Sequence, residues 1–263
     1  MDIELIILRA IGHAIPPVPR SAAIINRIVK PFYARRPRGR IQCNVLGAKM
    51  ELDPYDSVDA QLIFCPQLYD RKEIAFLKNI LMPGDTFVDV GAHVGFYSLM
   101  ASKFISKGKI LAIEANPETF ETLYKNSLLN ESLITVLNTG VSDREEVLDL
   151  WIQTRGNKGG TSFINAGDGA SVKVKCKPLA KILQEADIEA IKVLKIDIEG
   201  YEHKVLAHFL SEVPRTMWPN YVVTEFFPHL QSRSTGDQVA LLHRHGYVDV
   251  LNTGYNRVLH YSS

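Results

Sequence analysis

Acidic side chains stand at the ends of several short apolar runs of this 263-residue sequence. They are Glu114, Asp197, Glu199 and Glu225. A carboxylate at the end of a buried run is costly unless it binds something. Such a group can take a proton from a reacting hydroxyl or help to hold a divalent cation. We predict that Asp197 is catalytic and lies nearest the reacting atoms, with Glu199 and Glu225 close to it.

A glycine-rich turn follows the β-branched run 86–90 and reads Asp89-Val90-Gly91-Ala92-His93-Val94-Gly95. Gly91 lets the chain turn sharply and pass close to a ligand, and Gly95 lets the next helix pack tightly. Free N–H groups at the start of that helix can hold a carboxylate. Asp89 can take an ammonium group, directly or through a water, and His93 either touches the ligand or simply follows the turn.

Glu114 comes after the next apolar run, at a spacing from Gly91 that is typical of a carboxylate binding both hydroxyls of a ribose. A charge that complements a helix dipole is the alternative. The turn and the carboxylate together predict a nucleoside-containing cofactor. A dinucleotide would need G-x-G-x-x-G beside its pyrophosphate, but His93 occupies the second glycine position. S-adenosylmethionine, which has no pyrophosphate, is therefore favoured over NAD.

Alternating strands and helices must position these residues. β-branched and apolar runs predict strands at 86–90, 109–113, 134–137, 147–152, 172–176, 192–198, 221–226, 247–251 and 257–261. Helical spacing predicts helices at 69–81, 96–104, 117–129, 179–185, 201–210 and 238–245, with Asp70 capping the first. This alternation predicts a mostly parallel sheet, and the closing hairpin predicts one antiparallel edge strand. Ligands of such sheets bind at the carboxyl ends of the strands.

Composition excludes several classes of protein. The net charge of +1 gives no reason to expect nucleic acid. Cys43, Cys65 and Cys176 lack metal-binding spacing, so we expect neither a disulfide framework nor a zinc site, and a reducing compartment fits. No apolar run reaches the length of a membrane span. These features predict a soluble, cytoplasmic protein with no resident metal.

The motifs resemble those of the FkbM family of methyltransferases. The resemblance runs over about residues 70–230 and rests on 89–95, Ile113-Glu114-Ala115-Asn116-Pro117, Val141-Ser142-Asp143 and 194–202, in the family's order. It implies an α/β fold, a doubly wound, mostly parallel seven-stranded sheet of the class I, Rossmann-like type. It also implies cofactor contacts at Asp89, Gly91, His93, Gly95, Glu114, Ala115, Asn116, Val141 and Asp197. The family usually carries Asn where this chain has His93.

The resemblance further implies a methyltransferase that uses S-adenosylmethionine, most often for O-methylation of a hydroxyl on a sugar, glycolipid or natural-product intermediate. N-methylation of an amide or amine, such as a peptide side chain, is the alternative within the family. We expect direct in-line transfer of the methyl group to the acceptor, with a carboxylate taking the proton. The same carboxylates could instead hold a divalent ion that polarises the hydroxyl.

Three other functions share some of these features. An NAD-dependent oxidoreductase shares the turn and the ribose carboxylate, but the glycine pattern is incomplete. A cofactor-binding scaffold without catalysis would not need Asp197, Glu199 and Glu225. A nucleic-acid methyltransferase would need more positive charge than the cluster Arg35, Arg36, Arg38 and Arg40 supplies. That cluster is interpreted as a solvated linker rather than as a contact for an anionic substrate or surface.

The segment before residue 71 differs from the rest. Residues 1–40 predict two short helices split by a proline-rich run, and residues 41–56 are predicted to be extended around a turn at Gly47. We expect residues 1–70 to form a helical and extended cap for the substrate, or an oligomerisation region, and residues 71–263 to form the methyltransferase domain. Residues 156–169 could form a lid, in which Thr161 and Ser162 contact the ligand.

Overall fold

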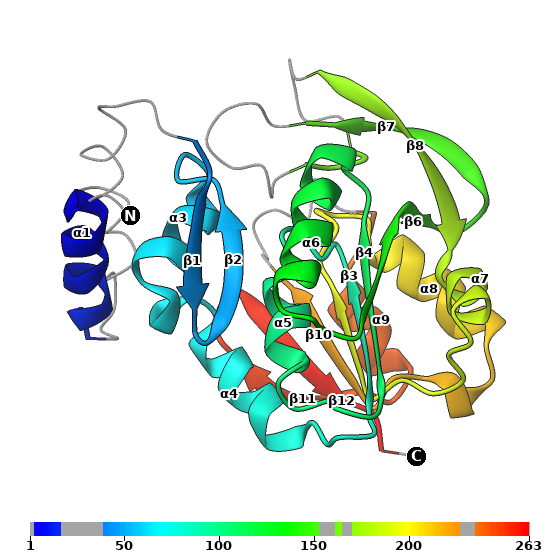
Figure 1. The fold of residues 1–263 in the computed structure, drawn as a ribbon. Coiled ribbons are helices and arrows are strands. Elements are labelled where there is room, and N and C mark those ends of the chain that lie inside the picture. Colours follow the sequence, from blue (N-terminus) through cyan, green and yellow to red (C-terminus); the bar gives the residue numbers. More distant parts are fainter. Residues whose placement is uncertain (1–2, 17–38, 153–160, 165–169, 227–234, 263) are drawn as a thin grey trace.

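The computed structural model describes residues 3–16, 39–152, 161–164, 170–226 and 235–262. Its centre is a seven-stranded sheet in the order β11-β12-β10-β9-β3-β4-β5 (Figure 1). The strands are β3 (Thr86–Val90), β4 (Lys109–Glu114), β5 (Ile134–Asn138), β9 (Val193–Ile196), β10 (Tyr221–Glu225), β11 (Val248–Asn252) and β12 (Asn256–His260). Four neighbouring pairs, from β10 to β5, are parallel. The predicted mostly parallel seven-stranded α/β sheet is therefore confirmed.

One detail of the predicted sheet is wrong. The antiparallel strand β12 is not at the edge: it lies between β10 and β11, and β11 forms the edge. Burial explains this order, because Val258 and Leu259 of β12 are fully buried whereas most of β11 is exposed. The more apolar strand of the hairpin takes the inner position, where both of its edges are paired.

Helices cover both faces of the sheet. On one face lie α4 (Arg71–Ile80), α5 (Phe96–Ala101) and α6 (Pro117–Leu129), and on the other α7 (Leu179–Glu185), α8 (Glu202–Glu212) and α9 (Gln238–Arg244). Successive strand residues point to opposite faces, so Phe87 belongs to the first core and Val88 to the second. This double covering is the doubly wound arrangement that the sequence predicts.

A second, three-stranded sheet stands above the carboxyl ends of the central strands (Figure 1). It consists of β6 (Gly140–Ser142), β8 (Ser171–Pro178) and β7 (Glu146–Trp151), in that order. The strands at 147–152 and 172–176 were predicted, and they pair with each other rather than with the central sheet. β6 is too short to be recognised from the sequence.

The first described residues form a smaller layer beside α6. It contains α1 (Ile3–Ala14), the hairpin β1 (Ile41–Val45) and β2 (Ala48–Leu52), and α3 (Ser57–Phe64), followed by the short 3₁₀ helix η1 (Pro66–Leu68). Asn126 of α6 ties this layer to the domain: its Oδ1 accepts the N–H of Glu51 at 2.7 Å, and its Nδ2 donates to the carbonyl of Val94 at 2.9 Å. α3 was not predicted. The second helix expected before residue 40 lies outside the described residues.

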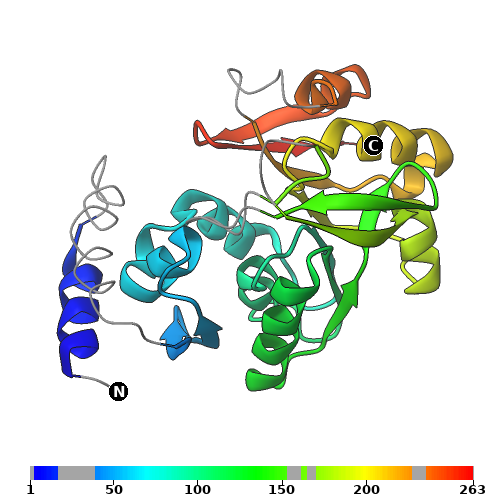
Figure 2. The same cartoon turned by 90° about the horizontal axis from the view of Figure 1, so that it is seen from above.

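Figure 2 shows α1 at the outer edge of the molecule, against α3 and away from the central sheet. A second 3₁₀ helix, η3 (Arg215–Met217), precedes β10. Among the residues that the structure describes, no helix combines the length and the apolar character that crossing a bilayer requires.

Candidate active site

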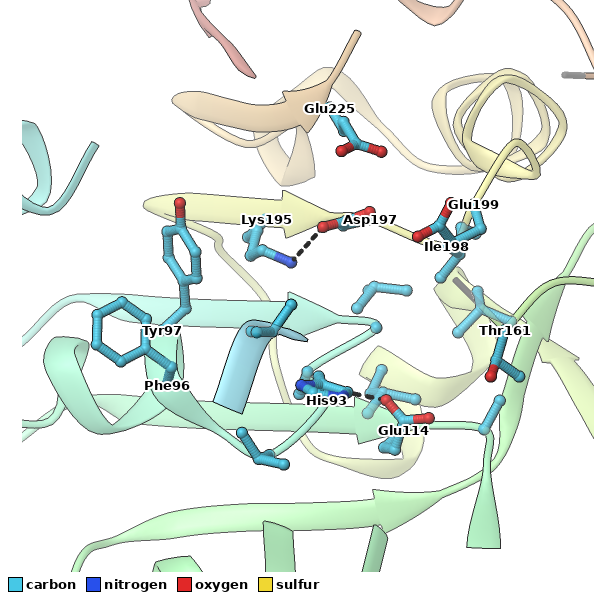
Figure 3. Close-up of a pocket in the computed structure, with 18 of the residues that line it drawn as sticks. His93, Phe96, Tyr97, Glu114, Thr161, Lys195, Asp197, Ile198, Glu199 and Glu225 are labelled. Atoms are coloured by element: carbon cyan, nitrogen blue, oxygen red, sulfur yellow. Dashed lines mark hydrogen bonds and ion pairs between the residues drawn. The ribbon is translucent and has the colours of Figure 1, made fainter. Parts of the chain in front are cut away.

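A pocket opens at the carboxyl ends of β3, β4, β9 and β10 (Figure 3). Its empty volume is about 1100 Å³, the open mouth included. Eight of the predicted site residues line it: Gly91, His93, Glu114, Ala115, Val141, Asp197, Glu199 and Glu225. Asp89, Gly95 and Asn116 are not among its lining residues. Figure 3 shows Glu114 on one side of the pocket and Asp197 and Glu225 on the other.

Gly91 brings the turn after β3 against the turn after β9. Its φ of +75° lies in the left-handed region, and a Cβ there would sit 1.8 Å from the carbonyl oxygen of Asp197. The Asp197 N–H donates to the carbonyl of Val90 at 3.0 Å, which fixes the approach. Only glycine allows this contact. Gly91 therefore positions Asp197 as well as forming the pocket wall.

Glu114 is held by two backbone donors. Its Oε2 accepts the N–H of His93 and its Oε1 that of Asn116, both at 2.8 Å. Burial raises the pKa of the Glu114 carboxyl to about 7, although the two hydrogen bonds from backbone N–H groups lower it. Each oxygen keeps a further lone pair, so the carboxylate can still accept two ligand hydroxyls. The side chain of Asn116 caps α6 by accepting the N–H of Glu118. The backbone N–H of Asn116 orients Glu114.

Asp89 lies behind the pocket wall. Its side chain is fully buried, and Oδ2 accepts the hydroxyl of Ser98 at 2.7 Å. The nearest charge to Oδ1 is the ammonium of Lys195, at 3.8 Å. Asp89 therefore contacts protein groups and does not line the pocket, and the predicted contact with a ligand ammonium, directly or through a water, stays a prediction.

Lys195 is a pocket residue that the sequence analysis missed. Its Nζ lies 3.3 Å from Oδ2 of Asp197 and 5.1 Å from the centre of the Tyr97 ring. Burial alone would lower the pKa of this ammonium, but the charges of Asp197 and Asp89 overcome that and raise it. Period-two alternation in a strand places residues 195 and 197 on the same side, a signal that could have revealed the pair.

The three predicted catalytic carboxylates meet at the pocket. Asp197, Glu199 and Glu225 each bring one oxygen within 4.8 Å of the others. Burial first, and the charge of Asp197 second, raise the pKa values of both Glu199 and Glu225. These two groups therefore tend to hold protons and to donate hydrogen bonds at neutral pH. The ammonium of Lys195 and the protonation of Glu199 and Glu225 together limit the negative charge of the cluster.

Glu202 has a structural role in the turn after β9. Its carboxylate accepts the N–H groups of Ile198 and Gly200 at 2.7 and 2.9 Å. It thereby closes the turn at the start of α8. Glu199, with a φ of 54°, is left facing the pocket. The turn separates a carboxylate that holds the backbone from one that is available to a ligand.

His93 adopts a left-handed backbone conformation, with φ at 51°. Asn, Asp and His adopt this region more readily than other residues with a Cβ, so His fits where the FkbM family usually has Asn. A ring nitrogen of His93 lies within 4.8 Å of carboxylate oxygens of Asp56 and Asp59 in α3 and its cap. Burial raises the pKa of Asp59 to about 8, and the charge of Asp56 adds to this shift. His93 thus links the glycine turn to the N-terminal layer.

Aromatic side chains from the N-terminal layer and α5 line the pocket beside the carboxylates. They are Tyr69, Phe96 and Tyr97. The Tyr97 hydroxyl donates to Asp70 at 2.8 Å. Asp70 is the N-cap residue of α4, but its side chain makes no capping hydrogen bond, so the predicted cap is wrong in this respect. Its φ of 42° turns the carboxylate toward Tyr97 instead.

The opposite wall comes from the second sheet and the segment after it. Val141, Leu150, Thr161 and Phe163 contribute to this wall. Ser162 pairs with Trp151 and donates its hydroxyl to the carbonyl of Glu199 at 2.8 Å. Of the predicted lid, 156–169, only residues 161–164 are described. Thr161 lines the pocket, and its predicted contact with a ligand stays a prediction.

Comparison with known proteins agrees with this geometry. A family profile described as "Methyltransferase FkbM domain" matches residues 89–248, more than half of the chain. The strand order, the doubly wound layers and this match define a class I methyltransferase fold. The chain belongs to the FkbM methyltransferase family.

Three curated relatives are similar over part of their length. "Methyltransferase sdnD" of Sordaria araneosa is 28% identical over 48% of this chain and 61% of that protein. "31-O-demethyl-FK506 methyltransferase FkbM" of Streptomyces tacrolimicus is 28% identical over 65% and 75%, respectively. "Hexuronic acid methyltransferase AglP" of Haloferax volcanii is 24% identical over 54% and 55%. The matched region is thus less than two thirds of sdnD and of AglP.

Proposed function

We propose that this protein transfers a methyl group from S-adenosylmethionine to a hydroxyl of a small molecule, such as a sugar, glycolipid or natural-product intermediate. The observation that carries the proposal is the pairing, in one pocket, of Glu114 with the carboxylate cluster around Asp197. The relatives named for 31-O-demethyl-FK506 and hexuronic acid support a hydroxylated acceptor. N-methylation of an amide or amine is the alternative that uses the same site.

The residues present fit this cofactor. Glu114 would hold the ribose hydroxyls, because it is fixed by two N–H groups and keeps acceptor capacity. Ala115, Val141 and Phe163 would lie against the apolar parts of the nucleoside. The backbone at Gly91 permits close approach of the ligand. When bound, S-adenosylmethionine supplies a methyl group on a positively charged sulfur, which is already a good electrophile.

The chain's own groups must orient the acceptor and take its proton. Asp197 is the proposed base, since it stands at the end of β9 with its oxygen beside those of Glu199 and Glu225. Lys195 fixes that carboxylate through their ion pair of 3.3 Å. Glu199 and Glu225, whose pKa values are raised, can donate hydrogen bonds to the oxygens of a polyol. The cluster could also hold a divalent ion, but Lys195 already supplies positive charge, so the proposal assigns no metal.

We also propose that residues 1–70 form the acceptor side of the site and that residues 71–263 form the methyltransferase domain. Val58 and Tyr69 carry this idea, because they come from the first segment and line the pocket. Cys43, Cys65 and Cys176 are free and buried, which supports a reducing compartment such as the cytoplasm.

Replacing Glu114 with Ala tests the cofactor assignment. We expect S-adenosylmethionine to bind roughly a hundredfold more weakly or worse, because each lost hydrogen bond to a charged group contributes about 1.5–3 kcal/mol. Glu121→Ala is the matched control, since that glutamate is exposed on α6. Calorimetric titration measures both variants, and circular dichroism checks their folding.

The same titration gives a pH test. Burial raises the pKa of Glu114 to about 7, and the ionised form is the better acceptor for ribose hydroxyls. Wild-type affinity should therefore fall as the pH drops through about 7. Equal affinity of the wild type and Glu114→Ala for S-adenosylmethionine would show that Glu114 does not bind the cofactor.

A further inference from the structure

Helix α1 presents an apolar face to solvent. Ile3, Ile6, Ile7 and Ile11 are 74%, 46%, 53% and 54% exposed. With the exposed Ala10 and Ala14 they follow the three- and four-residue spacing of one helical face. We call the four exposed isoleucines the isoleucine stripe.

The opposite face of α1 is fixed to the protein, so the stripe cannot turn inward. Leu5 is 3% exposed, and a Cβ at Gly12 would lie 2.0 Å from the carbonyl oxygen of Phe64. Arg9 donates from Nε to the carbonyl of Ile63 at 3.1 Å and from its terminal nitrogen to that of Asn44 at 2.7 Å. These contacts hold α1 against α3 (Figure 2), while the isoleucine stripe stays exposed.

The part of the sequence that carries α1 is strongly basic. Residues 1–40 contain eight Lys and Arg but two Asp and Glu, whereas residues 41–263 contain 22 and 27. Positive charge is thus concentrated in the part of the sequence that carries the exposed apolar face, although the whole chain is nearly neutral. An occupant of this face must therefore be apolar where it meets the stripe and must tolerate or prefer positive charge.

We propose that the isoleucine stripe docks the protein on an anionic lipid surface. Branched apolar side chains on one helix face enter the boundary between head groups and acyl chains, and basic residues close to the helix in sequence add attraction to anionic lipids. A second copy of this chain would also cover the stripe, but it would bring two basic segments together. The charge of residues 1–40 therefore favours lipid over self-association.

Vesicle flotation of the full chain tests this proposal without measuring methyl transfer. The probes are vesicles of phosphatidylcholine alone and of phosphatidylcholine mixed equally with phosphatidylglycerol. We expect binding to the anionic vesicles, weakened by added salt, and little binding to neutral ones. Ile7→Glu with Ile11→Glu should weaken binding at least about tenfold, because apolar burial is replaced by like-charge repulsion. Leu133→Glu is the control, because Leu133 is 73% exposed and lies outside α1, and this variant should bind vesicles as the wild type does.

A second double variant, Ile3→Ser with Ile6→Ser, replaces the glutamate pair if that pair does not fold. Thermal unfolding compares the stability of every variant with that of the wild type. Absence of wild-type binding to anionic vesicles would overturn the proposal, as would unchanged binding in both stripe variants. Sedimentation velocity tests the alternative occupant, a second copy of this chain. A dimeric wild type and monomeric stripe variants, with no vesicle binding, would overturn the lipid proposal and assign the face to a second copy. Since no arm uses cofactor or acceptor, these outcomes are independent of the proposed function.

Discussion

Asp197→Asn should lower methyl transfer by roughly 10²–10⁴-fold, the range that a general base contributes. The amide nearly matches the carboxylate in shape but cannot take a proton from an acceptor hydroxyl. S-adenosylmethionine affinity should stay close to that of wild type, because Glu114, on the other side of the pocket, supplies the proposed ribose contact. Turnover is measured as S-adenosylhomocysteine released with a hydroxylated acceptor that the wild-type protein selects from a panel of sugars and polyols.

The control for this prediction is Glu189→Gln, which neutralises an exposed carboxylate outside the pocket lining. It should leave both turnover and cofactor affinity unchanged. Wild-type turnover in Asp197→Asn would show that another group takes the proton. Lost cofactor affinity in that variant would instead move Asp197 from the reacting centre to the cofactor site.

Gly91→Ala should unfold at much lower denaturant concentration than wild type. Its methyl group would lie 1.8 Å from the carbonyl oxygen of Asp197, and the φ of +75° disfavours any side chain. Because that oxygen belongs to the backbone and is held through the bond from Asp197 N–H to Val90, relief requires the turns after β3 and β9 to separate. We expect the free energy of unfolding to fall by about 3 kcal/mol or more.

Gly84→Ala is a matched control for that loss. Nothing lies within 4 Å of a Cβ placed at Gly84, and its φ is outside the left-handed region. Urea unfolding of this variant should stay within about 0.5 kcal/mol of wild type. If Gly91→Ala were equally stable, the close approach of the two turns would not be a constraint on the fold.

The sheet was predictable because buried parallel strands are continuous apolar runs bounded by turn residues. The helix at 117–129 was predicted with its true ends, since Asn116 and Pro117 are a strong start signal. The position of β12 was not predictable from local pattern, because it depends on which hairpin strand gains more by burial against β10. Asp70 was predicted as a cap, but the Tyr97 hydroxyl, distant in sequence, competes for its carboxylate.

The candidate site was partly predictable for a similar reason. Glu114, Asp197 and Glu225 follow parallel strands, so the topology brings them to one edge of the sheet. Lys195 was missed because it was treated as part of a strand rather than as the partner of Asp197. Tyr69 comes from the segment before α4, and no local pattern indicates that this segment folds over the pocket. The burial of Asp89 behind the pocket wall was not predictable, because it depends on how β3 packs against Ser98 of α5.

Calorimetric titration of the wild-type protein with S-adenosylhomocysteine, beside NAD, tests the central claim most directly. The pocket around Glu114 predicts that S-adenosylhomocysteine binds with a dissociation constant in roughly the micromolar range and that NAD does not bind. Binding of NAD without S-adenosylhomocysteine would contradict the account, because the pocket would then serve a dinucleotide.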